Sequence, residues 1–94
     1  MAKTDPNGLK IDKGVPKVVT EDEMLDLMIV NPTFSKVDLY IGDVVPDADS
    51  KGGIPLRQDV AFVRNDTENM PALQGKVTVF CETSDVVLSV TLAE

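Results

Sequence analysis

The stretch that decides the fold is Lys76-Val-Thr-Val-Phe-Cys-Glu-Thr-Ser-Asp-Val-Val-Leu-Ser-Val-Thr-Leu-Ala-Glu94. Two runs of alternating apolar and polar residues, rich in β-branched side chains, flank a short polar turn. This pattern predicts a β-hairpin that turns one face of each strand toward a core. Its predicted core residues are Val77, Val79, Cys81, Val86, Leu88, Val90 and Leu92. A lone hairpin is marginally stable in water, so the rest of the chain must supply further strands.

Two earlier segments also have the pattern of strands. In residues 34–45, apolar residues at alternate positions predict a strand with one solvated face. In residues 56–64, Val60 and Phe62 share one face while Ala61 and Val63 share the other, which is typical of a central strand or of an interface on the outer side. We therefore predict a mainly β protein, a small antiparallel sandwich or open barrel.

One short helix is predicted at about residues 20–31. Thr20 and Glu23 have the spacing of a capping box, and Asn31-Pro32 provides a stop signal. The apolar face of this helix consists of Met24, Leu25, Leu27 and Met28. This face either packs on the sheet or forms an interaction surface, because Met side chains adapt to irregular partners.

Residues 1–19 are predicted to form an extended or flexible N-terminal arm, followed by a single small β-rich domain at residues 20–94. Turn-forming residues in Asp5-Pro6-Asn7-Gly8, together with Gly14 and Pro16, exclude a helix in this segment. A disordered leader has such a composition. Its spaced apolar residues favour instead an arm that adds a strand to a neighbouring chain. The candidate contact residues of the arm are Leu9, Ile11, Val15 and Val18.

The net charge of −7 is unevenly distributed along the 94 residues. Lysines outnumber acids in residues 1–19, whereas residues 20–50 are strongly acidic and contain a single base, Lys36. An acidic body repels polyanions, so we expect no nucleic-acid partner. The candidate acidic contact residues are Glu21, Asp22, Glu23 and Asp26. They form either a solvated helix face or a surface for a basic partner, including one that imitates the phosphates of DNA.

Catalytic and metal-binding chemistry is sparse in this sequence. The chain contains no His, the commonest general base and metal ligand. Cys81 is the only Cys, so no internal disulfide exists, and its apolar surroundings predict a small core residue. Asp47 and Asp49 match the opening of a calcium loop, but Lys51 occupies a ligand position and favours a plain solvated turn. We predict no cofactor, no metal site and no enzymatic activity.

These patterns predict a non-enzymatic structural or interaction subunit that staples neighbouring chains in a larger assembly, such as a virion decoration, cement or tail accessory protein. Its expected partner is protein, most simply further copies in a homo-oligomer or larger symmetric assembly. The alternative is an acidic inhibitor, adaptor or DNA mimic that binds a basic protein. No apolar segment suits a membrane span or a signal peptide, so we expect a cytoplasmic protein, or a virion component if the source is viral.

Overall fold

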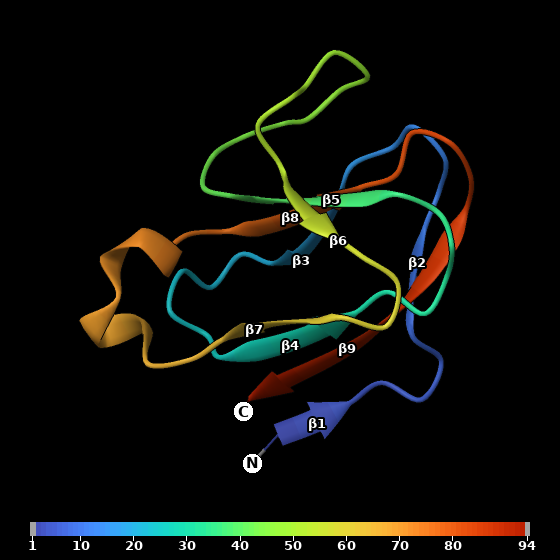
Figure 1. Cartoon of the computed structure of the whole chain (residues 1–94). Coiled ribbons are helices and arrows are strands. Elements are labelled where there is room, and N and C mark those ends of the chain that lie inside the picture. Colours follow the sequence, from blue (N-terminus) through green and yellow to red (C-terminus); the bar gives the residue numbers. More distant parts are fainter. Residues whose placement is uncertain (1, 94) are drawn as a thin grey trace.

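The computed structural model describes residues 2–93 as two packed antiparallel sheets (Figure 1). One sheet has the strand order β1-β9-β4-β7, with β2 also paired to β9, and the other has the order β3-β8-β5-β6. Two short 3₁₀ turns, η1 (Thr67–Asn69) and η2 (Pro71–Leu73), precede β8. The strands are β1 (Ala2–Thr4), β2 (Leu9–Ile11), β3 (Lys17–Thr20), β4 (Leu27–Val30), β5 (Val37–Ile41), β6 (Ile54–Leu56), β7 (Ala61–Arg64), β8 (Val77–Phe80) and β9 (Val86–Ala93). The predicted mainly β sandwich is confirmed.

The strand pairing follows a single rule. β2 pairs with β9, β3 with β8, β4 with β7 and β5 with β6, so the chain forms one long antiparallel ribbon that turns back between β5 and β6. Rolling this ribbon up brings β4 against β9 and β5 against β8, which closes the two sheets. This is the strand order of a jelly roll, in which every connection from β2 to β9 crosses between the sheets except the one that joins β5 to β6.

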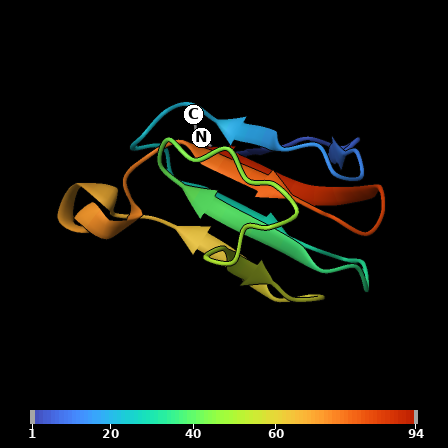
Figure 2. The same cartoon turned by 90° about the horizontal axis from the view of Figure 1, so that it is seen from above.

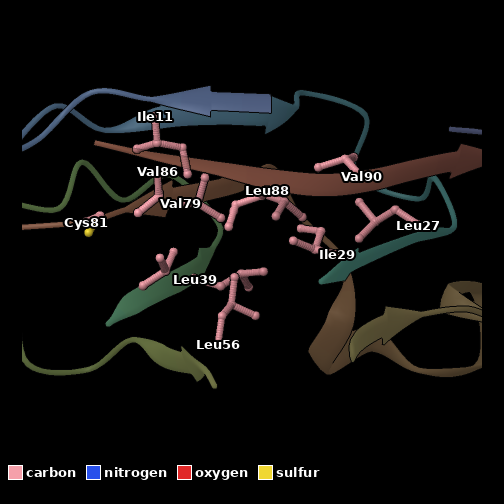
Figure 3. Close-up of a cluster of buried hydrophobic side chains, with 12 residues drawn as sticks. Ile11, Leu27, Ile29, Leu39, Leu56, Val79, Cys81, Val86, Leu88 and Val90 are labelled. Carbon is pink, nitrogen blue, oxygen red and sulfur yellow. The ribbon is translucent and has the colours of Figure 1, made fainter. Parts of the chain in front are cut away.

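The predicted hairpin at the C-terminal end is wrong in its pairing. β8 and β9 belong to different sheets and face each other across the core, and residues 81–85 cross between the sheets. The predicted inward faces are confirmed, because all seven side chains pack in or against the core cluster. Figure 3 labels five of them, Val79, Cys81, Val86, Leu88 and Val90. An alternating pattern determines which face of a strand is buried, but it does not determine the neighbouring strand.

The predicted helix at residues 20–31 is also wrong. β3 ends at Thr20, residues 21–26 form an irregular connection, and β4 follows. Leu27 and Ile29 are buried while Met28 between them is exposed, so the segment has the period of a strand. The Thr20 hydroxyl accepts a hydrogen bond from the Asp22 N–H at 3.0 Å, which forms a local turn in place of a helix cap. Pairing of β4 with both β7 and β9 outweighs the capping signal.

The segment predicted as an arm contributes strands to both sheets. β1 and β2 pair with β9, and β3 pairs with β8 on the opposite sheet. Ile11 is fully buried in the core cluster. Residues 2–20 therefore form three short strands joined by turns, and they lie within the sandwich and do not reach away from it (Figure 2).

Candidate interaction surface

Apart from Lys10 on β2, which lies beside Val87, the outer face of the β1-β9-β4-β7 sheet carries no charge between its two ends. Its outward positions alternate with buried core residues along β4 and β9. Met28 lies beside Val63 on one side and beside Thr91 on the other, and Thr91 lies beside Thr4. We call this surface the uncharged face, and it consists of Thr4, Met28, Val30, Ala61, Val63, Val87, Ser89, Thr91 and Ala93.

Large apolar side chains on the uncharged face remain accessible. Val63 is half exposed, and Met28 and Val87 are exposed to a similar degree. The two-sided apolar pattern of residues 60–63 therefore reflects a core face and an apolar outer face on β7. β7 is also the last strand of its sheet in residues 2–93. It has neither a proline nor a lysine of the kind that commonly protects an edge strand.

The other sheet has an outer face that its own chain covers. Thr78, Tyr40 and Phe80 point outward there and are nevertheless buried. The connection 42–53 lies over them (Figure 2), and Gly53 approaches Tyr40 so closely that a Cβ atom would meet its ring at 2.8 Å. Burial raises the pKa of Tyr40, and the nearby carboxylate of Asp38 raises it further, although a hydrogen bond with Ser50 opposes both. Within residues 2–93, no connection covers the uncharged face in this way.

The two ends of the sandwich differ in charge. Because successive strands run in opposite directions, connections 21–26, 42–53 and 65–76 leave the sheets at one end, which we call the acidic end. These connections contain nine acids and two bases, but connection 42–53 turns back over its sheet, so that Asp47 and Lys51 line a pocket with Lys36 and Glu82 of the opposite end. The four connections at the opposite end contain four acids and three bases, so charge is nearly balanced there. The acidic residues that remain at the acidic end are Glu21, Asp22, Glu23, Asp26, Asp43, Asp66 and Glu68.

Arg64 at the end of β7 holds two connections of the acidic end together. Its side chain is fully buried, and it donates four hydrogen bonds to backbone carbonyl groups. Nε reaches the Leu25 oxygen at 2.8 Å, and the two terminal nitrogens reach the oxygens of Asp22 at 2.9 Å and Gly75 at 2.6 Å. Burial lowers the pKa of Arg64, while the carboxylates of Asp22 and Asp26 act in the opposite direction.

Other contacts fix the remaining carbonyl groups of connection 21–26. The Thr67 hydroxyl donates to the Met24 oxygen at 2.7 Å, and the Gly75 N–H donates to the Glu23 oxygen at 2.9 Å. With its backbone held in this way, the connection presents four exposed carboxylates on a defined path. These are the predicted acidic contact residues Glu21, Asp22, Glu23 and Asp26, which the structure brings together without a helix.

The predicted arm residues do not share one exposed surface. Leu9 and Ile11 face the core on β2. Val15 is exposed in the connection 12–16, and Val18 lies on the outer side of the opposite sheet, beside Thr78. The structure therefore divides these residues between the core, one end of the sandwich and the second sheet.

Cys81, Asp47 and Asp49, the candidate reactive and metal-binding residues, take part in contacts that stabilise the fold. Cys81 is fully buried, and although burial alone raises its pKa, hydrogen bonds from Ser84 and Thr83 outweigh burial and lower it. Asp47 closes a turn by accepting a hydrogen bond from the Asp49 N–H at 2.9 Å. Across residues 2–93, no group of three Cys or acidic side chains is placed to hold a metal ion.

Arg64 and the uncharged face are the features that sequence reasoning missed. Arg64 follows Phe62 at an inward position of an alternating strand, and a cation in such a place signals a buried carbonyl cluster. The uncharged face gathers residues from four strands, and only β7 indicated it in advance.

Comparison with protein-family models, curated proteins and solved structures found no match. The helical turns between residues 2 and 93 are too short and too polar to cross a membrane.

Proposed function

We propose that this chain is a non-enzymatic structural or interaction subunit that associates with neighbouring protein chains through the uncharged face. The uncharged face is the observation that carries this proposal. Charged residues make up 27% of the chain, yet the nine outward positions of this face include none, and Lys10 on β2 is the one charged neighbour within the described strands of the sheet. Exposed apolar surfaces of a few hundred Å² that span a sheet commonly mark sites of protein association.

The assemblies that we favour are virion decorations, cements and tail accessory complexes. Jelly-roll domains occur in viral capsids, among other proteins. This support is architectural, because one fold serves many functions. Further support comes from the half-covered sandwich, in which one outer face is protected by connection 42–53 and the other is left for a partner.

The acidic end supports a second candidate function, that of an inhibitor, adaptor or DNA mimic. Its carboxylates lie on connections whose backbones Arg64 fixes, so a basic partner meets a preformed array. Binding through this end would be electrostatic and would weaken as salt screens the charges.

Fractionation of the native source by size tests the proposed function. We expect the chain to elute in a complex larger than the 10.2 kDa monomer and to remain there at high ionic strength. Replacing Met28 and Val63 together by Lys should release the chain as monomer. Val45→Lys is the control, because Val45 is 80% exposed on connection 42–53, which covers the other sheet.

Two results would contradict this proposal. Elution of the unmodified chain as free monomer would argue against any stable assembly. A complex that dissociates in salt and tolerates Lys at positions 28 and 63 would favour the acidic end as the binding surface.

A further inference from the structure

We infer that a second copy of this chain occupies the uncharged face, packed sheet against sheet with its strands running in the opposite direction. This inference rests on the proposed function and names the partner. It follows from the chemistry of the face and from the distribution of charge between the two ends of the sandwich.

The chemistry of the face suits self-association. In a two-fold interface, a residue close to the axis meets its own copy, so a charge in that place would face a like charge. The middle of the face lies where β4 and β9 run side by side, with Met28 and Val30 next to Thr91 and Ser89. All four side chains are uncharged, so two identical faces can meet without repulsion. Met28 can also adapt its shape to the opposing surface.

The area of the face limits the strength of the contact. At about 3.4 Å per residue and about 4.8 Å between strands, the strands β1, β2, β4, β7 and β9 cover roughly 360 Å². Two copies would bury roughly 700 Å² together, which is below the standard size of a stable interface and suits a weak, transient one. Sheets of sandwich proteins pack face to face at about 10 Å in this manner. We therefore expect a weak dimer that is populated at high protein concentration.

The distribution of charge selects the orientation. With strands parallel, the acidic ends of the two copies would lie together and repel. With strands reversed, each acidic end lies over the balanced end of the other copy. Lys10 lies beside Val87 at the balanced end of the sheet, whereas Asp26 immediately precedes β4 at the acidic end. The reversed arrangement therefore brings Asp26 toward the end that carries Lys10.

Sedimentation equilibrium of the purified full chain tests the identity of the partner. We expect a mass that rises with concentration from 10.2 kDa toward twice that value. Salt should strengthen the dimer, because it screens repulsion between two copies of net charge −7. Met28→Lys should raise the dissociation constant at least about tenfold, since symmetry places two charges in the interface.

Two matched variants complete this test. Val63→Lys should act like Met28→Lys, and Val45→Lys should dimerise like the unmodified chain, with circular dichroism confirming that all three are folded. A purified chain that stays monomeric would overturn the second-copy inference, while a large complex in the native extract would still support the proposed function. A dimer that tolerates Lys at both positions of the face would also overturn the inference.

A label at the acidic end tests the orientation. Asp26 is exposed immediately before the central strand β4, and the native Cys81 is fully buried, so Asp26→Cys offers a single accessible thiol for a nitroxide. In the reversed dimer, the two labels lie at opposite ends, separated by roughly 20 Å or more. In a parallel dimer, a label beside a central strand would lie within roughly the 10 Å spacing of packed sheets of its copy, and that short distance would overturn the reversed arrangement.

Discussion

Replacing Arg64 by Met should lower the free energy of unfolding by about 3–5 kcal/mol, because Met cannot donate the hydrogen bonds that buried carbonyl groups require. Arg64 donates four hydrogen bonds to backbone oxygens in two connections. Each carbonyl group left buried without a donor costs about 1–3 kcal/mol, although water can reach some of them after the change. A domain of this size has roughly 5–10 kcal/mol of stability in total, so the loss is severe.

Urea denaturation followed by circular dichroism measures this loss. Arg57→Met is the matched control, because Arg57 is exposed in the connection between β6 and β7 and should change stability by less than about 0.5 kcal/mol. Arg64→Lys keeps the charge but lacks the planar guanidinium group with its several donors. Its free energy of unfolding should therefore lie between those of the unmodified chain and Arg64→Met. Equal stability of Arg64→Met and Arg57→Met would show that Arg64 does not hold the acidic end together.

Replacing Leu88 by Ala should destabilise the chain by about 2–5 kcal/mol, because it removes buried methyl groups and leaves a cavity. Leu88 is fully buried on β9, the strand that pairs with β1, β2 and β4 (Figure 3). Aromatic residues are few, so the aliphatic core has little capacity to refill the space.

Val87→Ala is the control for Leu88→Ala. Val87 is the neighbouring residue on the same strand, but it lies on the uncharged face and is 45% exposed. Its truncation should change the free energy of unfolding by less than about 0.5 kcal/mol when the protein is dilute enough to be monomeric. Similar losses for both variants would contradict the assignment of the inner and outer faces of β9.

Sequence periodicity predicted the inner faces of the strands better than it predicted their partners. Val79 and Leu88 point inward as expected, because alternation of side chains is a local property. Their strands belong to opposite sheets, since pairing depends on contacts between residues far apart in the sequence. A polar turn between two alternating runs is compatible both with a hairpin and with a connection between sheets.

Local helix signals failed in residues 20–31 because tertiary pairing outweighs them. Thr20 and Glu23 have the spacing of a helix cap, but the segment that follows is required between β7 and β9. Leu27 and Ile29 are both buried, which is the alternation of a strand and not the spacing of a helix. In the acidic segment, the four predicted residues are exposed together, but they lie on an irregular connection and not on the predicted helix.

The candidate surfaces were only partly predictable for the same reason. Ala61 and Val63 indicated an apolar outer side on one strand, but the remainder of the uncharged face comes from strands distant in the sequence. The acidic end likewise gathers three connections that are separated along the chain. Neither the uncharged face nor the acidic end can be derived from the sequence without the strand order of the jelly roll.

Oxidation of three methionines in the assembled protein tests most directly whether the uncharged face is the association surface. Met24, Met28 and Met70 are 42%, 39% and 47% exposed in the single chain, so they should react at similar rates when it is monomeric. Only Met28 lies on the uncharged face. With limiting peroxide and mass spectrometry, we expect Met28 to oxidise several-fold more slowly than the other two in the complex. Equal rates at all three methionines in the complex would contradict association through this face.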